Sequence, residues 1–165
     1  MRPIHWKHGV SGDWSDASDW SNGQVPGAAD DVVIHAAGDY TVTIDSAEAA
    51  KSLLLDASGA TIADNAAFAL GSTFIIEAGT FKIGHGGAVN VGTITVGTAG
   101  RLLARQGTLN AAVIDDGTIR AFSGILAIDG AVIPTCNKSD SLPTEGKCEG
   151  SSSFLKKRTK KLLFS

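Results

Sequence analysis

The sequence has little of several residue types that commonly reveal how a protein is held together. It has two cysteines in 165 residues, both near its C-terminal end, and only four prolines. A disulfide framework is therefore not needed for the first 134 residues, and a Cys136–Cys148 pair in an oxidising compartment is left open. Glycines do not fall at every third position, which excludes a collagen helix.

Long apolar segments are also missing. No stretch of about 20 apolar residues occurs, so the sequence predicts no membrane-spanning helix. Residues 1–10 contain no apolar run of about 7 to 15 residues behind the first positive charge, so no signal peptide is visible. We expect a cytosolic protein, a protein exported by a C-terminal signal, or a piece of a longer chain.

Positive charge is scarce in the main body of the chain. Residues 1–135 carry seven Lys and Arg against fourteen Asp and Glu, a net charge of −7, whereas residues 136–165 carry +4. The acidic body argues against nucleic acid as a partner. We interpret the basic run at residues 156–161 as a solvated tail, the alternative being contact with anionic lipid or nucleic acid.

Glycine and β-branched residues are abundant, and they recur together. Gly occurs 20 times, and many glycines begin a short unit that continues with a small residue or Thr and then a large apolar residue. The units begin at Gly59, Gly71, Gly79, Gly92, Gly100, Gly107, Gly117 and Gly124. Tyr40–Ile44 alternates large apolar residues with Thr, the two-residue period of a half-buried strand.

The glycine spacing predicts the fold class. Every second unit is separated by about 20 residues, the size of one coil of a parallel β-helix. We expect an all-β, right-handed parallel β-helix (a β-solenoid) of roughly five short coils with an N-terminal cap, in which Gly forms the corners and the large apolar residue points inward. An antiparallel sandwich is the alternative, but regularly placed two-residue hairpin turns are missing.

Composition divides the chain into three parts. Residues 1–34 form a segment rich in Trp and Asp that we expect to cap the solenoid, and its last three residues, Val32–Ile34, are predicted to form the first strand. The solenoid is expected over residues 35–134. Residues 135–165 are polar and then basic, and we expect an irregular tail, disordered or loosely helical, joined abruptly after Pro134.

The opening segment resembles a known sequence motif. It reads Gly12-Asp-Trp, a polar stretch, Asp19-Trp, then Pro26-Gly and Asp31-Val-Val-Ile34, with Asp19 where Asn is usual. This phrase is similar to the start of the β-helical region in adhesin-like and autotransporter-like repeat proteins of proteobacteria. The resemblance covers about residues 6–133. It implies a passenger or surface-repeat segment, extracellular or on the cell surface, with adhesion as the usual inferred role.

The Trp- and Asp-rich opening segment contains candidate residues for a metal site and for a sugar site. Asp13, Asp16, Asp19, Asp30 and Asp31 are candidate Ca²⁺ ligands, although their spacing is not that of an EF-hand, and turn capping is the alternative. His5 and His8 lie three residues apart, and His35 and His85 are isolated in the sequence, so we expect surface histidines rather than a zinc site. Candidate sugar-stacking residues are Trp6, Trp14 and Trp20, which we instead expect to cover the exposed end of the apolar column.

The sequence contains four candidate catalytic residues but does not define an active site. Asp115, Asp116, Arg120 and Asp129 are the catalytic candidates of a polysaccharide lyase or hydrolase, but nothing in the sequence fixes the separation of the carboxylates. We therefore expect a non-enzymatic structural or adhesive segment that contacts extracellular glycans or proteins and associates end to end through its C-terminal coil. A carbohydrate-active β-helix, either an enzyme or a sugar-binding module, is the alternative function.

Overall fold

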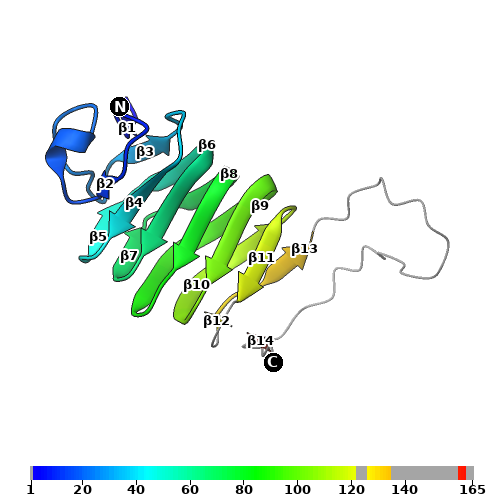
Figure 1. Ribbon diagram of the computed structural model, residues 1–165. Coiled ribbons are helices and arrows are strands. Elements are labelled where there is room, and N and C mark those ends of the chain that lie inside the picture. The colour runs from blue at the N-terminus through cyan, green and yellow to red at the C-terminus, as the bar shows by residue number, and fades with distance from the viewer. Residues whose placement is uncertain (1, 122–125, 135–159, 163–165) are drawn as a thin grey trace.

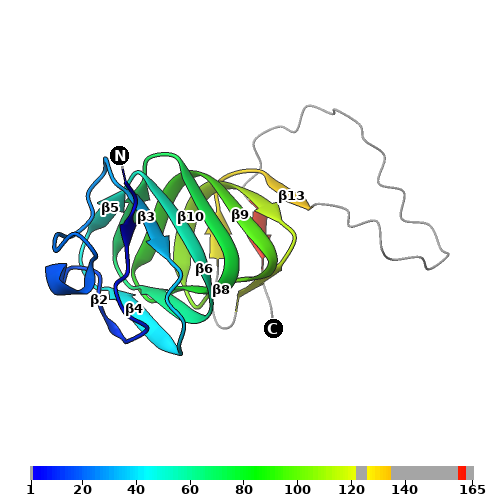
Figure 2. The same ribbon diagram turned by 90° about the horizontal axis from the view of Figure 1, so that it is seen from above.

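The computed structural model describes residues 2–121, 126–134 and 160–162, and these residues form a β-solenoid of about five coils (Figure 1). Every pairing among strands β1 to β13 is parallel, so the expected solenoid is confirmed and the antiparallel sandwich is excluded. The right-handed sense of the coil stays a prediction. Figures 1 and 2 show from two sides that the N-terminal strands lie at one end of the stack and β13 at the other.

Each coil contributes a strand to three sheet faces. The first face holds β1 (Ile4–His5), β3 (Asp31–Ile34), the starts of β6 (Ser52–Asp64) and β8 (Thr73–Ile83), the middle of β9 (Gly87–Ala104), the end of β10 (Gly107–Asp115), and β13 (Val132–Pro134). The second face holds β2 (Gly12–Asp13), β4 (Tyr40–Ile44), the later parts of β6, β8 and β9, and β11 (Thr118–Ala121). The third face holds β5 (Glu48–Ala50), β7 (Ala67–Leu70), the starts of β9 and β10, and β12 (Leu126–Ile128).

Strand register explains the sequence period. On the first face Val32 pairs with Leu53 and Leu53 with Phe74, so each coil advances the chain by about 20 residues. On the second face Val42 pairs with Ile62 and Ile62 with Phe81. These residues are buried, because alternate side chains of each strand point toward the interior. Each of these side chains packs against the residue at the same position in the next coil. The apolar column is therefore continuous from coil to coil.

The glycines at the coil corners serve close packing more than unusual backbone geometry. Gly79 has φ +97°, which favours glycine, and a Cβ there would lie 2.4 Å from the carbonyl oxygen of Ala57. At Gly100 the backbone is not left-handed, yet a Cβ would lie 2.1 Å from the carbonyl oxygen of Ile76 in the coil before it. These glycines therefore do more than form the expected corners, because the absence of a side chain also allows successive coils to pack closely against each other.

The N-terminal segment is partly built into the stack. Strands β1 and β2 add to the first and second faces, and β3 pairs in parallel with β6 over all four of its residues. Between β2 and β3 lies one 3-10 helix, η1 (Ala17–Asp19). The solenoid ladder therefore already includes Asp31–Ile34, which the composition assigns to the capping segment.

At the other end, strand β14 (Lys160–Leu162) pairs antiparallel with β12 on the third face. The sequence predicts no strand there. The expected irregular tail otherwise lies outside the described residues, as do Cys136, Cys148 and most of the basic run.

Candidate functional site

The aspartates of the opening segment serve local structure. Asp16 caps η1, and its Oδ1 accepts a hydrogen bond from the Ser18 N–H at 2.8 Å. Asp30 Oδ2 accepts from the Gly27 N–H at 2.9 Å, which closes the turn before β3. The turn-capping alternative therefore accounts for both residues.

Asp31 is held by the following coil. Its Oδ1 accepts a hydrogen bond from the Ser52 hydroxyl at 2.6 Å, and its Oδ2 forms an ion pair with Lys51 Nζ at 3.1 Å. The Ser52 hydrogen bond, followed by the Lys51 hydrogen bond, lowers the pKa of Asp31 below its usual value. Hydrogen bonds from Ser18 likewise lower the pKa of Asp16.

The candidate Ca²⁺ ligands do not converge in the described part of the chain. Across residues 2–121, 126–134 and 160–162, no three His, Cys, Asp or Glu side chains gather closely enough to hold a metal ion. Asp13, Asp16, Asp19, Asp30 and Asp31 are thus not assembled into a site. One pairing was not expected: the Nδ1 atoms of His5 and His35 lie 3.4 Å apart, although His35 is isolated in the sequence.

The three tryptophans lie inside the protein. Trp6 is 1% exposed, and Trp14 and Trp20 are fully buried. The Trp20 ring packs edge-on against both other indoles, and Trp20 Nε1 donates to the Trp14 carbonyl at 2.7 Å. Trp14 in turn packs against Phe68 with ring centroids 5.0 Å apart. The structure contradicts a sugar-stacking platform, because none of these ring faces is open to solvent.

The proposed catalytic residues are distributed over different corners. Asp115 ends β10 and its Oδ1 accepts from the Gly117 N–H at 3.0 Å, while exposed Asp116 lies in the turn before β11. Asp129 follows β12 on the third face, and Arg120 lies within β11 on the second face. The four residues do not form the acidic cleft that a lyase or hydrolase would need.

What the fold does bring together is a group of cations on the second face. Lys82 of β8 and Arg120 of β11 both pair in register with Leu103 of β9. Arg101 and Arg105 lie two residues before and after Leu103, and the Arg105 N–H continues the ladder by donating to Ile83 at 2.9 Å. Leu103 is therefore surrounded by four cationic residues, which we call the cationic cross.

The dimensions of a β-sheet fix the spacing of the cationic cross. Neighbouring strands lie about 4.8 Å apart and alternate residues about 6.6 Å apart along a strand. The Cα atoms of Lys82 and Arg120 are thus separated by about 10 Å. Arg105 follows the end of β9, so its Cα atom lies at most about 13 Å from that of Arg101, the reach of four extended residues. All four cationic side chains are exposed and Leu103 is half-buried, so the charged groups surround an apolar side chain that is less accessible to solvent than they are.

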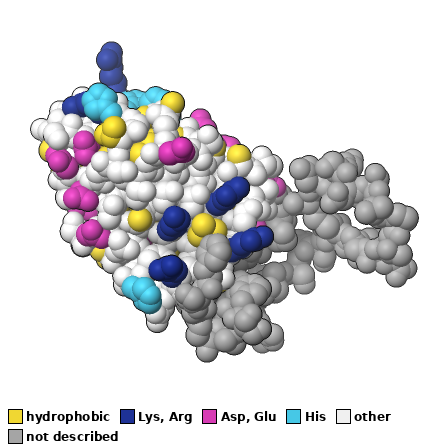
Figure 3. Space-filling view, viewed as in Figure 1, with side chains coloured by type: hydrophobic (Ala, Val, Ile, Leu, Met, Phe, Trp, Pro, Cys, Tyr) yellow, Lys and Arg dark blue, Asp and Glu magenta, His cyan; other side chains and the backbone are white. Residues whose placement is uncertain are grey.

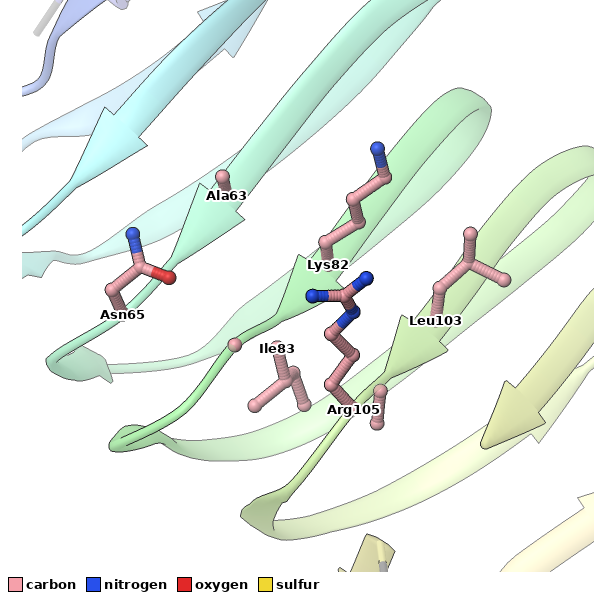
Figure 4. Close-up of a pocket in the computed structure, with 8 residues that line it drawn as sticks. Ala63, Asn65, Lys82, Ile83, Leu103 and Arg105 are labelled. Carbon is pink, nitrogen blue, oxygen red and sulfur yellow. The ribbon is translucent and has the colours of Figure 1, made fainter. Parts of the chain in front are cut away.

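A cleft of about 810 Å³ is lined in part by Lys82 and Arg105 of the cationic cross and by Leu103 (Figure 4). Asn65, Lys82 and Arg105 contribute its polar side chains and come from three successive coils. Its floor includes Ile83 and Ala104, which also belong to the buried column. No carboxylate is among the described residues that line it.

The described residues provide no ion pair that neutralises the charge on this face. Lys82, Arg101, Arg105 and Arg120 have no ion-pair partner among the residues whose positions are described. They are also the only Lys and Arg between residues 52 and 135. Figure 3 shows Lys and Arg side chains gathered over one part of this face, while several Asp and Glu side chains lie toward the N-terminal end.

Sequence reasoning missed the cationic cross, although a signal was present. Three of the repeated units read Gly79-Thr-Phe-Lys82, Gly100-Arg-Leu-Leu103 and Gly117-Thr-Ile-Arg120. The third residue after each glycine takes the same outward position in successive coils. Aligning the units by their glycines would have placed Lys82 and Arg120 on one row.

Comparison with known proteins adds no relative: no family model, no curated protein and no solved structure matches this chain. Within the described part of the chain, no helix has the length and apolar character to cross a membrane.

Proposed function

We propose that this chain is a non-enzymatic, adhesive segment of a β-solenoid protein and that it presents the second face to an extracellular polymer. The observation that carries the proposal is the cationic cross, a set of aligned and exposed charges that have no ion-pair partner among the described residues and that help to line a cleft. A stack of rigid strands holds these side chains at fixed spacing, which lowers the entropy lost when a repeating ligand binds.

The lining of the cleft favours binding over catalysis. Glycoside hydrolysis requires two carboxyl groups at a defined separation. Here the polar lining is an amide, an ammonium group and a guanidinium group, supplied by Asn65, Lys82 and Arg105. These groups can donate hydrogen bonds and attract anions, but they do not provide the acid and base pair of a hydrolase.

The extracellular setting is part of the proposal and rests on the resemblance of the opening phrase to adhesin-like repeat proteins. Export and cell-surface placement then follow from that likeness. End-to-end association is proposed from the edge of the stack, where strand edges attract further strands. Strands β11 and β13 lie at that edge and have no further pairing partner within the described residues.

A glycan array read together with a lyase and hydrolase screen tests this function. We expect the full chain to be retained by one class of polysaccharide and to release no product from it. Turnover that disappears in the Asp116→Asn variant would overturn the non-enzymatic proposal and favour the carbohydrate-active alternative. Failure to bind any immobilised glycan or extracellular protein would remove its adhesive part.

A further inference from the structure

The geometry of the second face points to a ligand class, and we infer that the cationic cross binds an anionic polysaccharide carrying carboxylate or sulfate groups. This inference rests on the proposed adhesive function and specifies its ligand. It names Arg101 and Arg105 as the main contacts, with Lys82 and Arg120 placed across the neighbouring strands.

Arginine chemistry supports an oxyanion. A guanidinium group offers five N–H donors in a planar fork that matches a carboxylate or a similar oxyanion with two parallel hydrogen bonds. Arg101 lies on β9 and Arg105 directly follows its last residue, Ala104; both side chains are exposed, and their Cα atoms are at most about 13 Å apart, the reach of four extended residues. Two charges at that distance suit successive anionic groups of one extended polymer better than a single small anion.

The neighbouring side chains suit a sugar backbone. Thr80 and Thr118 pair in register on either side of Arg101, and both are half-buried, as is Leu103. The two Thr hydroxyls can donate to or accept from sugar hydroxyls, while Leu103 offers a small apolar surface to the ring carbons. The face therefore combines charge, hydroxyl and apolar groups within three adjacent strands.

The outward side chains of this face disfavour two other polyanions. Because residues 1–135 carry a net charge of −7, attraction of any polyanion must come from the local positive field of the cationic cross, and the neighbouring side chains decide which polyanion fits. Base stacking would require exposed aromatic rings. The outward positions of the cationic cross and its neighbours hold Thr, Leu, Lys and Arg instead. An anionic lipid surface would also attract the four cationic side chains. Because lipid headgroups diffuse freely within the membrane, the fixed spacing of these side chains across three strands would not strengthen binding to it.

The experiment compares the full chain on matched polymers. Dextran sulfate and dextran differ only in charge, as do polygalacturonate and its methyl ester, and duplex DNA and phosphatidylserine vesicles serve as competing polyanions. We expect binding to the two anionic polysaccharides and none to their neutral partners. The Arg101→Gln/Arg105→Gln variant should bind at least tenfold more weakly, whereas Arg2→Gln, which removes an exposed charge outside the cross, should bind within twofold of wild type.

The outcomes separate the inference from the proposed function. Retention on the neutral polymers alone leaves an adhesive segment but overturns the anionic ligand. Equal binding by Arg101→Gln/Arg105→Gln and wild type, with unchanged circular dichroism, overturns the assignment to the cationic cross. Tighter binding to DNA or to vesicles than to either polysaccharide overturns the ligand class.

Discussion

Asp64 pairs in register with Ile83 and shares its inward-facing column, so a carboxyl group replaces a hydrocarbon side chain inside the solenoid. Asp64 is fully buried, and its Oδ2 has no hydrogen-bond partner among the described residues. Its Oδ1 accepts only a long hydrogen bond of 3.4 Å from the Ala66 N–H. Desolvation by burial raises the pKa of Asp64 to about 7, because the charged form loses its hydration.

Asp64 should therefore make stability fall as pH rises. Its folded-state pKa is raised, so between about pH 4 and pH 7 the folded chain binds more protons than the unfolded chain at this residue. Its contribution to the free energy of unfolding then decreases by up to about 1.4 kcal/mol per pH unit and levels off above pH 7. Urea unfolding at several pH values measures this slope.

Two substitutions isolate the Asp64 effect. Asp64→Asn removes the titration and should flatten the profile between pH 4 and pH 7. Asp56→Asn, on the same strand but exposed, should leave the wild-type profile unchanged. A wild-type slope that persists in Asp64→Asn would show that another group titrates.

Replacement of Gly100 by even the smallest side chain should destabilise the fold. A Cβ at this position would lie 2.1 Å from the carbonyl oxygen of Ile76, and backbone cannot yield as a flexible side chain can. We expect Gly100→Ala to lower the free energy of unfolding by about 1 to 3 kcal/mol. Gly23→Ala is a contrasting control, because a Cβ there meets nothing within 4 Å, although its φ of +72° adds local strain. Equal losses for both variants would argue against close approach as the cause.

Trp14 should be central to the N-terminal end of the column. It is fully buried between Trp20 and Phe68, so truncation opens a large cavity. Trp14→Ala is expected to cost about 3 to 5 kcal/mol of unfolding free energy, and Trp14→Phe less. Hydrogen exchange should show the greatest loss of protection in β2 and β4. A loss confined to the C-terminal coils would contradict the capping role.

The unpaired strand edge predicts association between chains. Ile133, which is 52% exposed on β13, lies at this edge. We expect the weight-average mass in sedimentation to rise with concentration and Ile133→Lys to reduce that rise, since charged residues protect strand edges. A concentration-independent monomer for the wild type would remove end-to-end association from the proposal.

The solenoid could be predicted because the residues that produce it recur at a regular spacing in the sequence. One glycine-led unit is repeated, and stacking such units buries one continuous column, as the series Val42, Ile62, Phe81 and Leu102 shows. The site was harder to predict. Arg101 and Lys82 occupy different positions of the repeated unit, and they meet around Leu103 only when successive units are aligned by their glycines.

The sugar-stacking and metal-site alternatives do not fit the structure for a common physical reason. Trp and Asp residues that lie close together in sequence can serve either an exposed site or local packing and turn capping. The fold uses the indoles as packing and uses Asp16, Asp30 and Asp31 to satisfy nearby donors. Asp64 gave no sequence signal, because its burial depends on the inward alternation of β6 rather than on its neighbours in the chain.

Binding of an anionic polysaccharide by the cationic cross is tested most directly by an amide chemical-shift titration of the ¹⁵N-labelled full chain with dextran sulfate. We expect the largest shifts on Thr80–Lys82, Arg101–Arg105 and Thr118–Arg120, the three segments that carry the cationic cross. The same signals should stay unmoved in dextran. Shifts that concentrate instead on the opening segment at residues 12–20, or no shifts at any polymer concentration, would contradict binding at the cationic cross.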